Sequence, residues 1–161
     1  MQLGIIAVGQ IRGTDEMPLV EDFHRRIEAS GRQLGISGLS IMELREKRAL
    51  AGAEKKRSEN ALIADALARR NGPLIVLDET GKSLTSRAFA DRLQGWVERG
   101  EAEITFVIGG ADGLDDAIRA RADMVLSFGP MTWPHMLVRV LLCEQIWRAV
   151  SILTRHPYHR D

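Results

Sequence analysis

Residues 104–114 read ITFVIGGADGL, and this stretch is the best guide to how the chain folds. Its first five residues form a strand-like run, and a helical pattern follows at residues 115–121, so the glycines make a strand-to-helix turn. Glycine lets backbone amides approach a ligand closely where a side chain would collide. The order G-G-x-x-G differs from the G-x-G-x-x-G fingerprint of dinucleotide-binding folds. Taken alone, the turn is either a ligand-binding loop or a tight turn before a helix.

The alternation of strand and helix continues along the chain. Strand-like runs lie at residues 3–8, 39–44, 74–77, 104–108 and 124–128, and helical patterns lie at residues 18–30, 53–70, 86–99, 115–121 and 134–153. This order predicts an α/β fold, a mostly parallel sheet flanked by helices, in one domain over residues 1–161. Ligands bind beyond the carboxyl ends of parallel strands, so the loops after Val8, Leu77, Ile108 and Phe128 are the candidate functional loops.

The helices are predicted from the spacing of their apolar residues. Val20, Phe23 and Ile27 recur at helical intervals and make one apolar stripe. Pro18 suits the first turn of that helix, and Thr85 is placed to cap the helix that begins at residue 86.

Composition and charge exclude several classes of protein. The 161 residues carry 22 Lys and Arg against 22 Asp and Glu, so the formal net charge is zero, and 45% of them are hydrophobic. No apolar run approaches the roughly 20 residues of a membrane-spanning helix, and the first residues lack the basic leader of a signal peptide. The single cysteine, Cys143, excludes an internal disulfide and indicates a reducing compartment, the cytoplasm. Because zero net charge gives no long-range field, an RNA partner must be recognised by shape or by a local patch.

Two further loops resemble functional motifs. Residues 78–83 read DETGKS, but the first glycine of a phosphate-binding P-loop would stand at position 76, which is Val76, so we predict a turn here and no nucleotide triphosphatase. Residues 128–135 read FGPMTWPH and predict a stiff loop. Such a loop either hydrogen-bonds the edge of a flat heterocycle between apolar side chains, or is a rigid connector in which Trp133 is simply buried.

The end of the chain is rich in groups that suit RNA. Residues 156–161 read HPYHRD, in which tyrosine can stack on bases, arginine can bind phosphate and histidine can move protons near neutral pH. The alternative is a solvated tail without a role, and two histidines without a third ligand make a poor metal site. Cys143 lies within the apolar last helix and is predicted to be a core thiol.

Residues 45–57 are basic. The segment holds six Lys or Arg residues against Glu46 and Glu54, a local excess of +4 in a chain that is neutral overall. It is either a patch that contacts phosphates or the solvated face of a loop and a helix start.

The ordered set of motifs closely resembles the ribosomal RNA large subunit methyltransferase H family. The motifs are VIGGADG at residues 107–113, TWPH at 132–135, VRVL at 138–141 and HPYHR at 156–160. The resemblance covers essentially the whole chain and implies a SPOUT fold with a C-terminal trefoil knot, and a homodimer whose two subunits share each active site. It also implies methylation of N3 of pseudouridine 1915 in bacterial 23S rRNA, with S-adenosylmethionine as the methyl donor.

The resemblance implies which residues bind the cofactor. They come from the three loops at the strand ends: Leu77, Gly109, Phe128, Gly129, Pro130, Met131, Thr132 and Trp133. Gly129 and Pro130 stand where many members carry serine or another polar residue, so we expect backbone contacts there.

The catalytic hypothesis places four side chains around the target base, namely His135, Tyr158, His159 and Arg160. Either histidine is the candidate proton acceptor, and Arg160 is expected to stabilise the developing anion. Glu144 and Arg148 on the last helix are expected to position the tail, because a charge on an apolar helix needs a partner. The alternatives are a SPOUT enzyme that acts on another RNA base and a ribosome-associated protein that binds RNA without chemistry. No membrane or DNA partner is expected.

Overall fold

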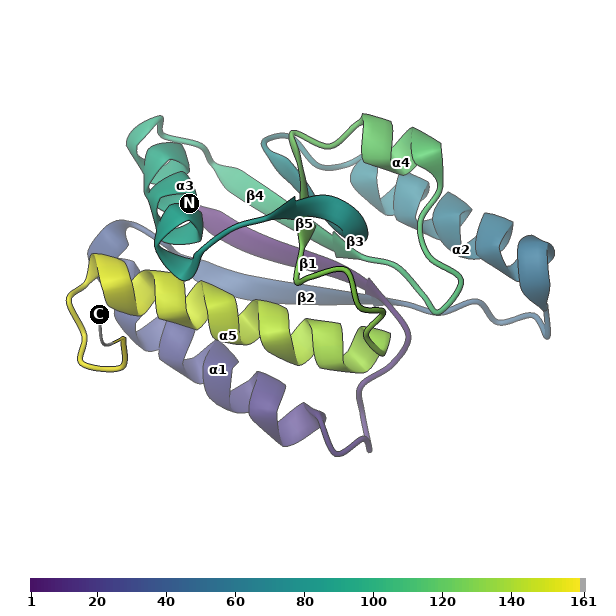
Figure 1. The fold of residues 1–161 in the computed structure, drawn as a ribbon, viewed down its shortest axis with the longest axis horizontal. Helices are drawn as coiled ribbons and strands as arrows, with labels where there is room; N and C mark the ends of the chain where they lie inside the picture. Colours follow the sequence, from purple (N-terminus) through teal and green to yellow (C-terminus); the bar gives the residue numbers. More distant parts are fainter. Residues whose placement is uncertain (160–161) are drawn as a thin grey trace.

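The computed structural model describes residues 1–159, and its centre is one five-stranded sheet (Figure 1). The strand order is β2-β1-β4-β3-β5, and every neighbouring pair is parallel, as the sequence predicts. The strands are β1 (Gln2–Val8), β2 (Gly38–Leu44), β3 (Leu74–Ser83), β4 (Glu103–Ile108) and β5 (Met124–Ser127).

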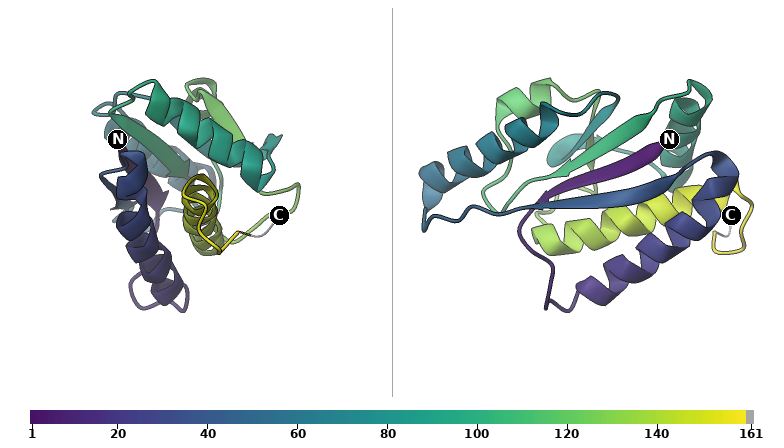
Figure 2. Two further views of the ribbon diagram at one scale, coloured as in Figure 1. Left: turned by 90° about the vertical axis from the view of Figure 1, so that its left-hand side faces the viewer. Right: turned by 180° about the vertical axis from the view of Figure 1, so that it is seen from behind.

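Helices cover both faces of this sheet. They are α1 (Met17–Gly31), the short 3₁₀ helix η1 (Arg32–Leu34), α2 (Gly52–Leu67), α3 (Ser86–Glu98), α4 (Asp116–Ala120) and α5 (His135–Leu153). Helices α1, α3 and α5 pack on one face, with α5 in contact with the other two, and α2 and α4 lie on the opposite face (Figure 2). The α/β arrangement expected from the sequence is therefore confirmed.

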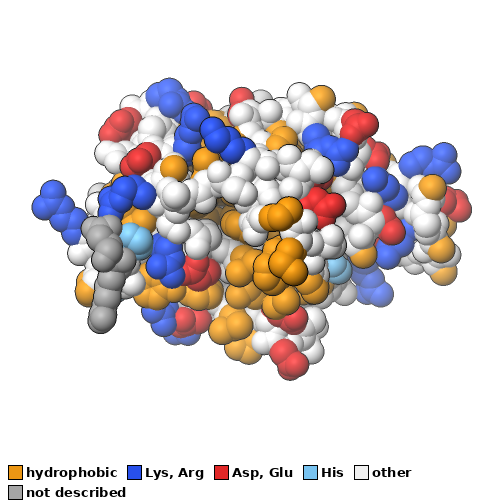
Figure 3. All heavy atoms as spheres, in the orientation of Figure 1, with side chains coloured by type: hydrophobic (Ala, Val, Ile, Leu, Met, Phe, Trp, Pro, Cys, Tyr) orange, Lys and Arg blue, Asp and Glu red, His pale blue; other side chains and the backbone are white. Residues whose placement is uncertain are grey.

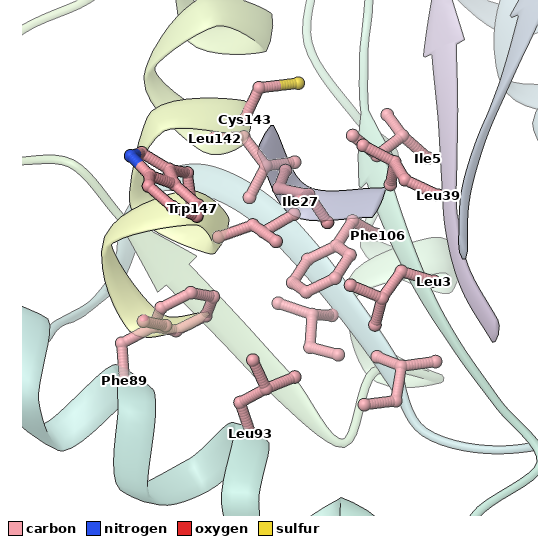
Figure 4. Packing of buried hydrophobic residues seen from close by; sticks show 14 of the residues in the cluster. Leu3, Ile5, Ile27, Leu39, Phe89, Leu93, Phe106, Leu142, Cys143 and Trp147 are labelled. Atoms are coloured by element: carbon pink, nitrogen blue, oxygen red, sulfur yellow. The ribbon is translucent and has the colours of Figure 1, made fainter. Parts of the chain in front are cut away.

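Strand β1 shows why the apolar runs are continuous. Leu3 and Ile5 point into the core with α1, α3 and α5, whereas Ile6 and Val8 point into the core with α2 and α4. Successive side chains of a strand point to opposite faces, so a strand covered on both sides must be apolar throughout. Figure 4 shows the larger core, in which Phe106 of β4 faces residues from the helices.

Both predicted helix-start signals are present. Pro18 occupies the first turn of α1, where the missing backbone N–H costs no hydrogen bond. The Thr85 hydroxyl accepts a hydrogen bond from the Ala88 N–H at 3.1 Å and caps α3. The predicted helix bounds agree with the observed ones to within three residues, and the largest difference is at α2, which ends at Leu67.

The predicted turn over residues 78–83 is wrong. Strand β3 continues to Ser83 and pairs with β5 twice, first through Ile75–Leu77 and again, after a register shift, through Lys82 and Ser83. A Cβ atom on Gly81 would lie 2.7 Å from the Val125 carbonyl oxygen. The glycine therefore allows β3 to pass close to β5, where a side chain would collide with backbone.

Helix α5 returns along the sheet, and both the N-terminus and the end of the described chain lie toward the same side of the molecule (Figure 1). The trefoil knot expected of this C-terminal segment and the one-domain organisation stay predictions. In residues 1–159, no helix combines the length and apolar character needed to cross a membrane.

Candidate functional site

A cleft of about 660 Å³ lies at the carboxyl ends of the strands. Its walls are β3 from Leu77 to Thr80, the loop after β4 and the loop after β5. This is the edge where parallel sheets bind ligands, and three of the four loops singled out from the sequence meet there.

Most of the predicted cofactor-binding residues line this cleft. Those that do are Leu77, Gly109, Phe128, Gly129, Met131, Thr132 and Trp133, and Pro130 does not. The Trp133 side chain is 43% exposed and Met131 is 72% exposed. The structure therefore contradicts the alternative in which Trp133 is a buried part of a rigid connector.

The turn after β4 packs tightly against its surroundings. A Cβ atom on Gly109 would lie 2.9 Å from the Leu114 side chain, and one on Gly110 would overlap the Glu59 carboxylate. The Gly113 N–H closes the turn on the Gly110 carbonyl oxygen at 3.0 Å. The tight turn is confirmed, and because the same residues form a wall of the cleft, ligand binding by this loop stays a prediction.

Asn60 of α2 holds this turn in place, and sequence reasoning missed it. Its amide donates to the Gly113 carbonyl oxygen at 3.3 Å, and its Oδ1 accepts from the Asp115 N–H at 2.8 Å. The side chain is only 4% exposed. Asn60 stands three and seven residues before Ile63 and Leu67, so a polar residue on the apolar stripe of a helix was the available signal.

Glu59, beside Asn60, is buried below the same turn. Its residue is 5% exposed, Oε1 lies 3.8 Å from Lys55 Nζ, and Oε2 has no hydrogen-bond partner among the described residues. Burial raises the pKa of this carboxyl group. The turn after β4 therefore rests on a polar side chain that fills the space beneath Gly110.

On the opposite wall, ion pairs and hydrogen bonds connect β3 to its neighbours. Asp78 accepts from Arg119 of α4 at 2.9 Å and from the Thr80 N–H at 2.9 Å. Burial alone would raise the pKa of Asp78, but the hydrogen bonds from Thr80 and Arg119 together hold it below its usual value, so the group is ionised. The Thr132 hydroxyl donates to Glu79 at 2.8 Å and ties the loop after β5 to this wall.

The loop after β5 presents mainly backbone to the cleft. Gly129 has a φ of +110°, a conformation that residues with side chains rarely adopt. The Ser127 hydroxyl accepts from the Gly129 N–H at 3.0 Å and lies 2.9 Å from the carbonyl oxygen of the same residue. These bonds fix the start of the loop.

His135, the first residue of α5, also lines the cleft. A Cβ atom on Gly9 would lie 3.0 Å from His135 Nε2, so the imidazole packs against the backbone that follows β1. Burial, and then the nearby positive charges of Arg139 and Lys55, lower the pKa of His135. The imidazole is consequently neutral at pH 7 and able to accept a proton.

Arg139, one turn further along α5, is fully buried and anchors the helix to the sheet. It pairs with Glu43 of β2 at 2.5 Å and donates to the Gly9 carbonyl oxygen at 3.0 Å. The ends of β1 and β2 are thereby fixed to the part of α5 that carries His135.

The tail lies at the other end of α5. The Tyr158 hydroxyl donates to Glu144 Oε1 at 2.9 Å, and Arg148 donates to the same oxygen at 2.6 Å while its guanidinium carbon lies 5.0 Å from the centre of the Tyr158 ring. Trp147 packs against that ring at 5.5 Å. The expectation that Glu144 and Arg148 position the tail is confirmed for Tyr158.

Comparison with known proteins identifies the family of this chain. A family model described as predicted SPOUT methyltransferase matches residues 1–159. The chain belongs to that family. It is 46% identical to the ribosomal RNA large subunit methyltransferase H of Ruegeria pomeroyi and 48% identical to that of Rhodopseudomonas palustris, over 99% of each chain in both cases. The family resemblance found in the sequence motifs is confirmed.

Within one copy of this SPOUT methyltransferase, the proposed catalytic residues are not brought together. His135 begins α5 in the cleft, and Tyr158 and His159 follow its far end. The Tyr158 hydroxyl bonds Glu144, nine residues and about 14 Å along α5 from His135, and neither Tyr158 nor His159 lines the cleft. Arg160, the fourth residue of the hypothesis, lies outside the described residues.

Cys143 takes no part in the cleft. It is a residue of α5 that is buried in the core, and burial raises the pKa of its thiol to about 12. A thiol that stays protonated at neutral pH is a poor nucleophile, so its role as a core residue is confirmed.

Proposed function

We propose that this SPOUT methyltransferase transfers a methyl group from S-adenosylmethionine to N3 of pseudouridine 1915 in 23S rRNA. The observation that carries the proposal is the cleft, whose walls are the family motifs and whose volume of about 660 Å³ is in the range of small-molecule sites. The relatives named ribosomal RNA large subunit methyltransferase H support the choice of substrate.

The residues of the cleft fit this cofactor. Apolar side chains such as Leu77 and Phe128 can sandwich a flat base, while the backbone of the loop after β5 can hydrogen-bond its edge. Gly109 and Gly110 bring backbone close to the cleft where a side chain would collide. The ionised Asp78 supplies negative charge to a ligand that carries a sulfonium. When bound, S-adenosylmethionine supplies an activated methyl group.

The protein must then align the base and remove a proton. Holding two reactants in line contributes about 7–11 kcal/mol to such a transfer. N3 of the base carries a proton that leaves as the nitrogen–methyl bond forms, and the neutral His135 is able to take it at the edge of the cleft. The Tyr158 hydroxyl donates to Glu144, and burial, together with that bond, raises the pKa of Tyr158, so it remains a donor at neutral pH.

A second copy of the chain completes the site in this proposal. In its own chain, Tyr158 is held on Glu144, about 14 Å along α5 from His135, and does not line the cleft. In this proposal, the tail that closes over the base therefore comes from a partner. Met131, Trp133 and Leu137 are exposed apolar residues around the start of α5, and orange side chains gather at the centre of the face in Figure 3. Two copies that run antiparallel along α5 would cover such residues and exchange their tails.

The test is methylation of ribosomes that lack the modification. They are incubated with the protein and labelled S-adenosylmethionine, and the labelled nucleotide is mapped by mass spectrometry. We expect label at the pseudouridine alone. Label on another nucleotide would point to a different RNA substrate. A protein that binds ribosomes but gives no label, and whose melting temperature S-adenosylmethionine does not raise, would be a binding protein without chemistry.

A further inference from the structure

Residues 45–57, here called the basic arm, join the end of β2 to the first turns of α2. The arm carries six Lys and Arg residues and two Glu residues, whereas the chain as a whole has 22 of each sign. Most of its residues are exposed, and blue side chains gather at the right-hand end of the molecule in Figure 3, where Figure 1 places the start of α2. Of these cations, only Lys55 enters the proposed chemistry of the cleft, because its charge helps to lower the pKa of His135.

Only part of the charge is neutralised within residues 1–159. Arg48 pairs with Glu46 at 3.1 Å, and Lys55 lies 3.8 Å from the buried Glu59. Lys47 and Arg57 are exposed and make no ion pair with any described residue. The arm therefore offers exposed cations to a partner, while its inner charges fix the shape of the arm.

The arm lies beside the cleft. Strand β2 is parallel to β1 and β4, so the arm leaves the sheet at the edge where the cleft opens. Lys56 lines the cleft itself, with Gly109 and His135 among the other lining residues. Four residues after Lys56, Asn60 bonds the turn after β4. Helix α2 thus carries the basic arm and supports the cofactor wall as one rigid element.

We propose that the basic arm binds backbone phosphates of the RNA next to the nucleotide that enters the cleft. This rests on the proposed function and specifies which surface holds the substrate. Phosphates are the partners that exposed, unpaired Lys and Arg side chains bind without reading sequence, and such contacts fix the register of the RNA. A neutral protein with a local basic surface binds RNA where the cations lie. The arm therefore directs the target nucleotide to the cleft and not to other parts of the surface.

The experiment removes two exposed cations from the arm in the double variant Lys47→Gln/Arg57→Gln. The matched control is Arg69→Gln, which removes an exposed cation just beyond the other end of α2, toward the opposite edge of the sheet. A second pair, Lys47→Arg/Arg57→Lys, keeps the charge. Co-sedimentation with ribosomes lacking the modification measures binding directly, and methyl transfer and S-adenosylmethionine affinity are measured in parallel.

We expect the neutralised variant to bind ribosomes about tenfold more weakly, with KM raised by the same factor. The kcat and the affinity for S-adenosylmethionine should match the wild type, because neither side chain belongs to the cleft. The slope of log affinity against log salt should fall by about 1 for each phosphate that no longer meets a cation. The charge-keeping pair and Arg69→Gln should stay within twofold of the wild type.

Three results would overturn the proposal. They are binding equal to the wild type with an unchanged salt slope, an equal weakening in Arg69→Gln, and a weakening that is seen with ribosomes but absent with protein-free 23S rRNA. The last result would assign the arm to a ribosomal protein. A wild-type protein that binds ribosomes through the arm but gives no label would contradict the proposed function and leave the arm proposal standing.

Discussion

The two ends of α5 are built in different ways. At the start of the helix, the cleft is shaped by backbone, with glycines that admit no side chain and loops tied by hydrogen bonds from Asn60 and Ser127. Along its second half, a network of charged and aromatic side chains, Glu144, Arg148 and Tyr158, holds the tail. In the proposed function, the first end binds a cofactor of fixed shape, and the second end holds side chains that meet a substrate that must enter and leave.

The largest expected effect tests whether one active site of a dimer combines the start of α5 from one chain with the tail of the other. His135→Ala and Tyr158→Ala are each expected to lose most methyl transfer when prepared alone. Co-expressed in equal amounts, half of the dimers combine one chain of each kind, and each such dimer has one complete site, so about a quarter of the wild-type activity should return. Both activities are measured as label transferred per dimer.

If each site used both residues of a single chain, the mixture would remain inactive. A mixture of His135→Ala with itself, prepared by the same co-expression, serves as the control for recovery caused by the procedure.

The next largest effect concerns the glycine turn after β4, which lines the cleft. A Cβ atom in Gly110→Ala would overlap Glu59, so the turn must shift, and we expect S-adenosylmethionine affinity to fall by about 100-fold, which corresponds to about 2.8 kcal/mol. Titration calorimetry measures the affinity. Gly95→Ala is the matched control, because a Cβ there meets only Arg99 at 3.5 Å and an alanine within a helix stabilises by about 0.5–1 kcal/mol.

A double variant that also replaces Glu59 tests the cause of this effect. If the collision is the cause, Gly110→Ala/Glu59→Ala should regain much of the affinity because the shorter side chain makes room. A double variant as weak as the single one would mean that Gly110 acts through its backbone conformation and not through the space beneath it.

Asn60→Ala should have a smaller effect on the same wall. The substitution leaves the Gly113 carbonyl and the Asp115 N–H without their side-chain partner, at a cost of about 1–3 kcal/mol in the free energy of unfolding. We also expect weaker S-adenosylmethionine binding, by about tenfold, because the turn after β4 loses its support. Denaturant unfolding and calorimetry give the two values, and Asn71→Ala, at an exposed position just beyond α2, should change neither.

The sequence predicted the backbone end of α5 better than the side-chain end. Strand runs, the glycine turn and the cap at Thr85 depend on residues close in sequence, so their pattern could be read directly. The missed features depend on contacts between distant segments. Gly81 lets β3 extend beside β5, Asn60 is buried against the turn after β4, and Tyr158 is held on Glu144 of α5 rather than beside His135. Residue types alone cannot give these distances.

The smallest expected effect is the pH dependence of the free energy of unfolding that is due to His135, at the cleft end of α5. Burial, followed by Arg139 and Lys55, lowers the pKa of His135 in the folded protein, so between that value and the ordinary histidine pKa the unfolded chain binds more protons than the folded one. The stability contributed by the neutral imidazole is therefore fully present above the ordinary pKa and is lost as the pH falls toward the lowered one. Urea unfolding of the wild type and of His135→Gln, compared at several pH values between about 7.5 and 5, should show a steeper decline for the wild type. Parallel curves would show that this imidazole titrates as it does in the unfolded chain, and that burial in the cleft does not favour its neutral form.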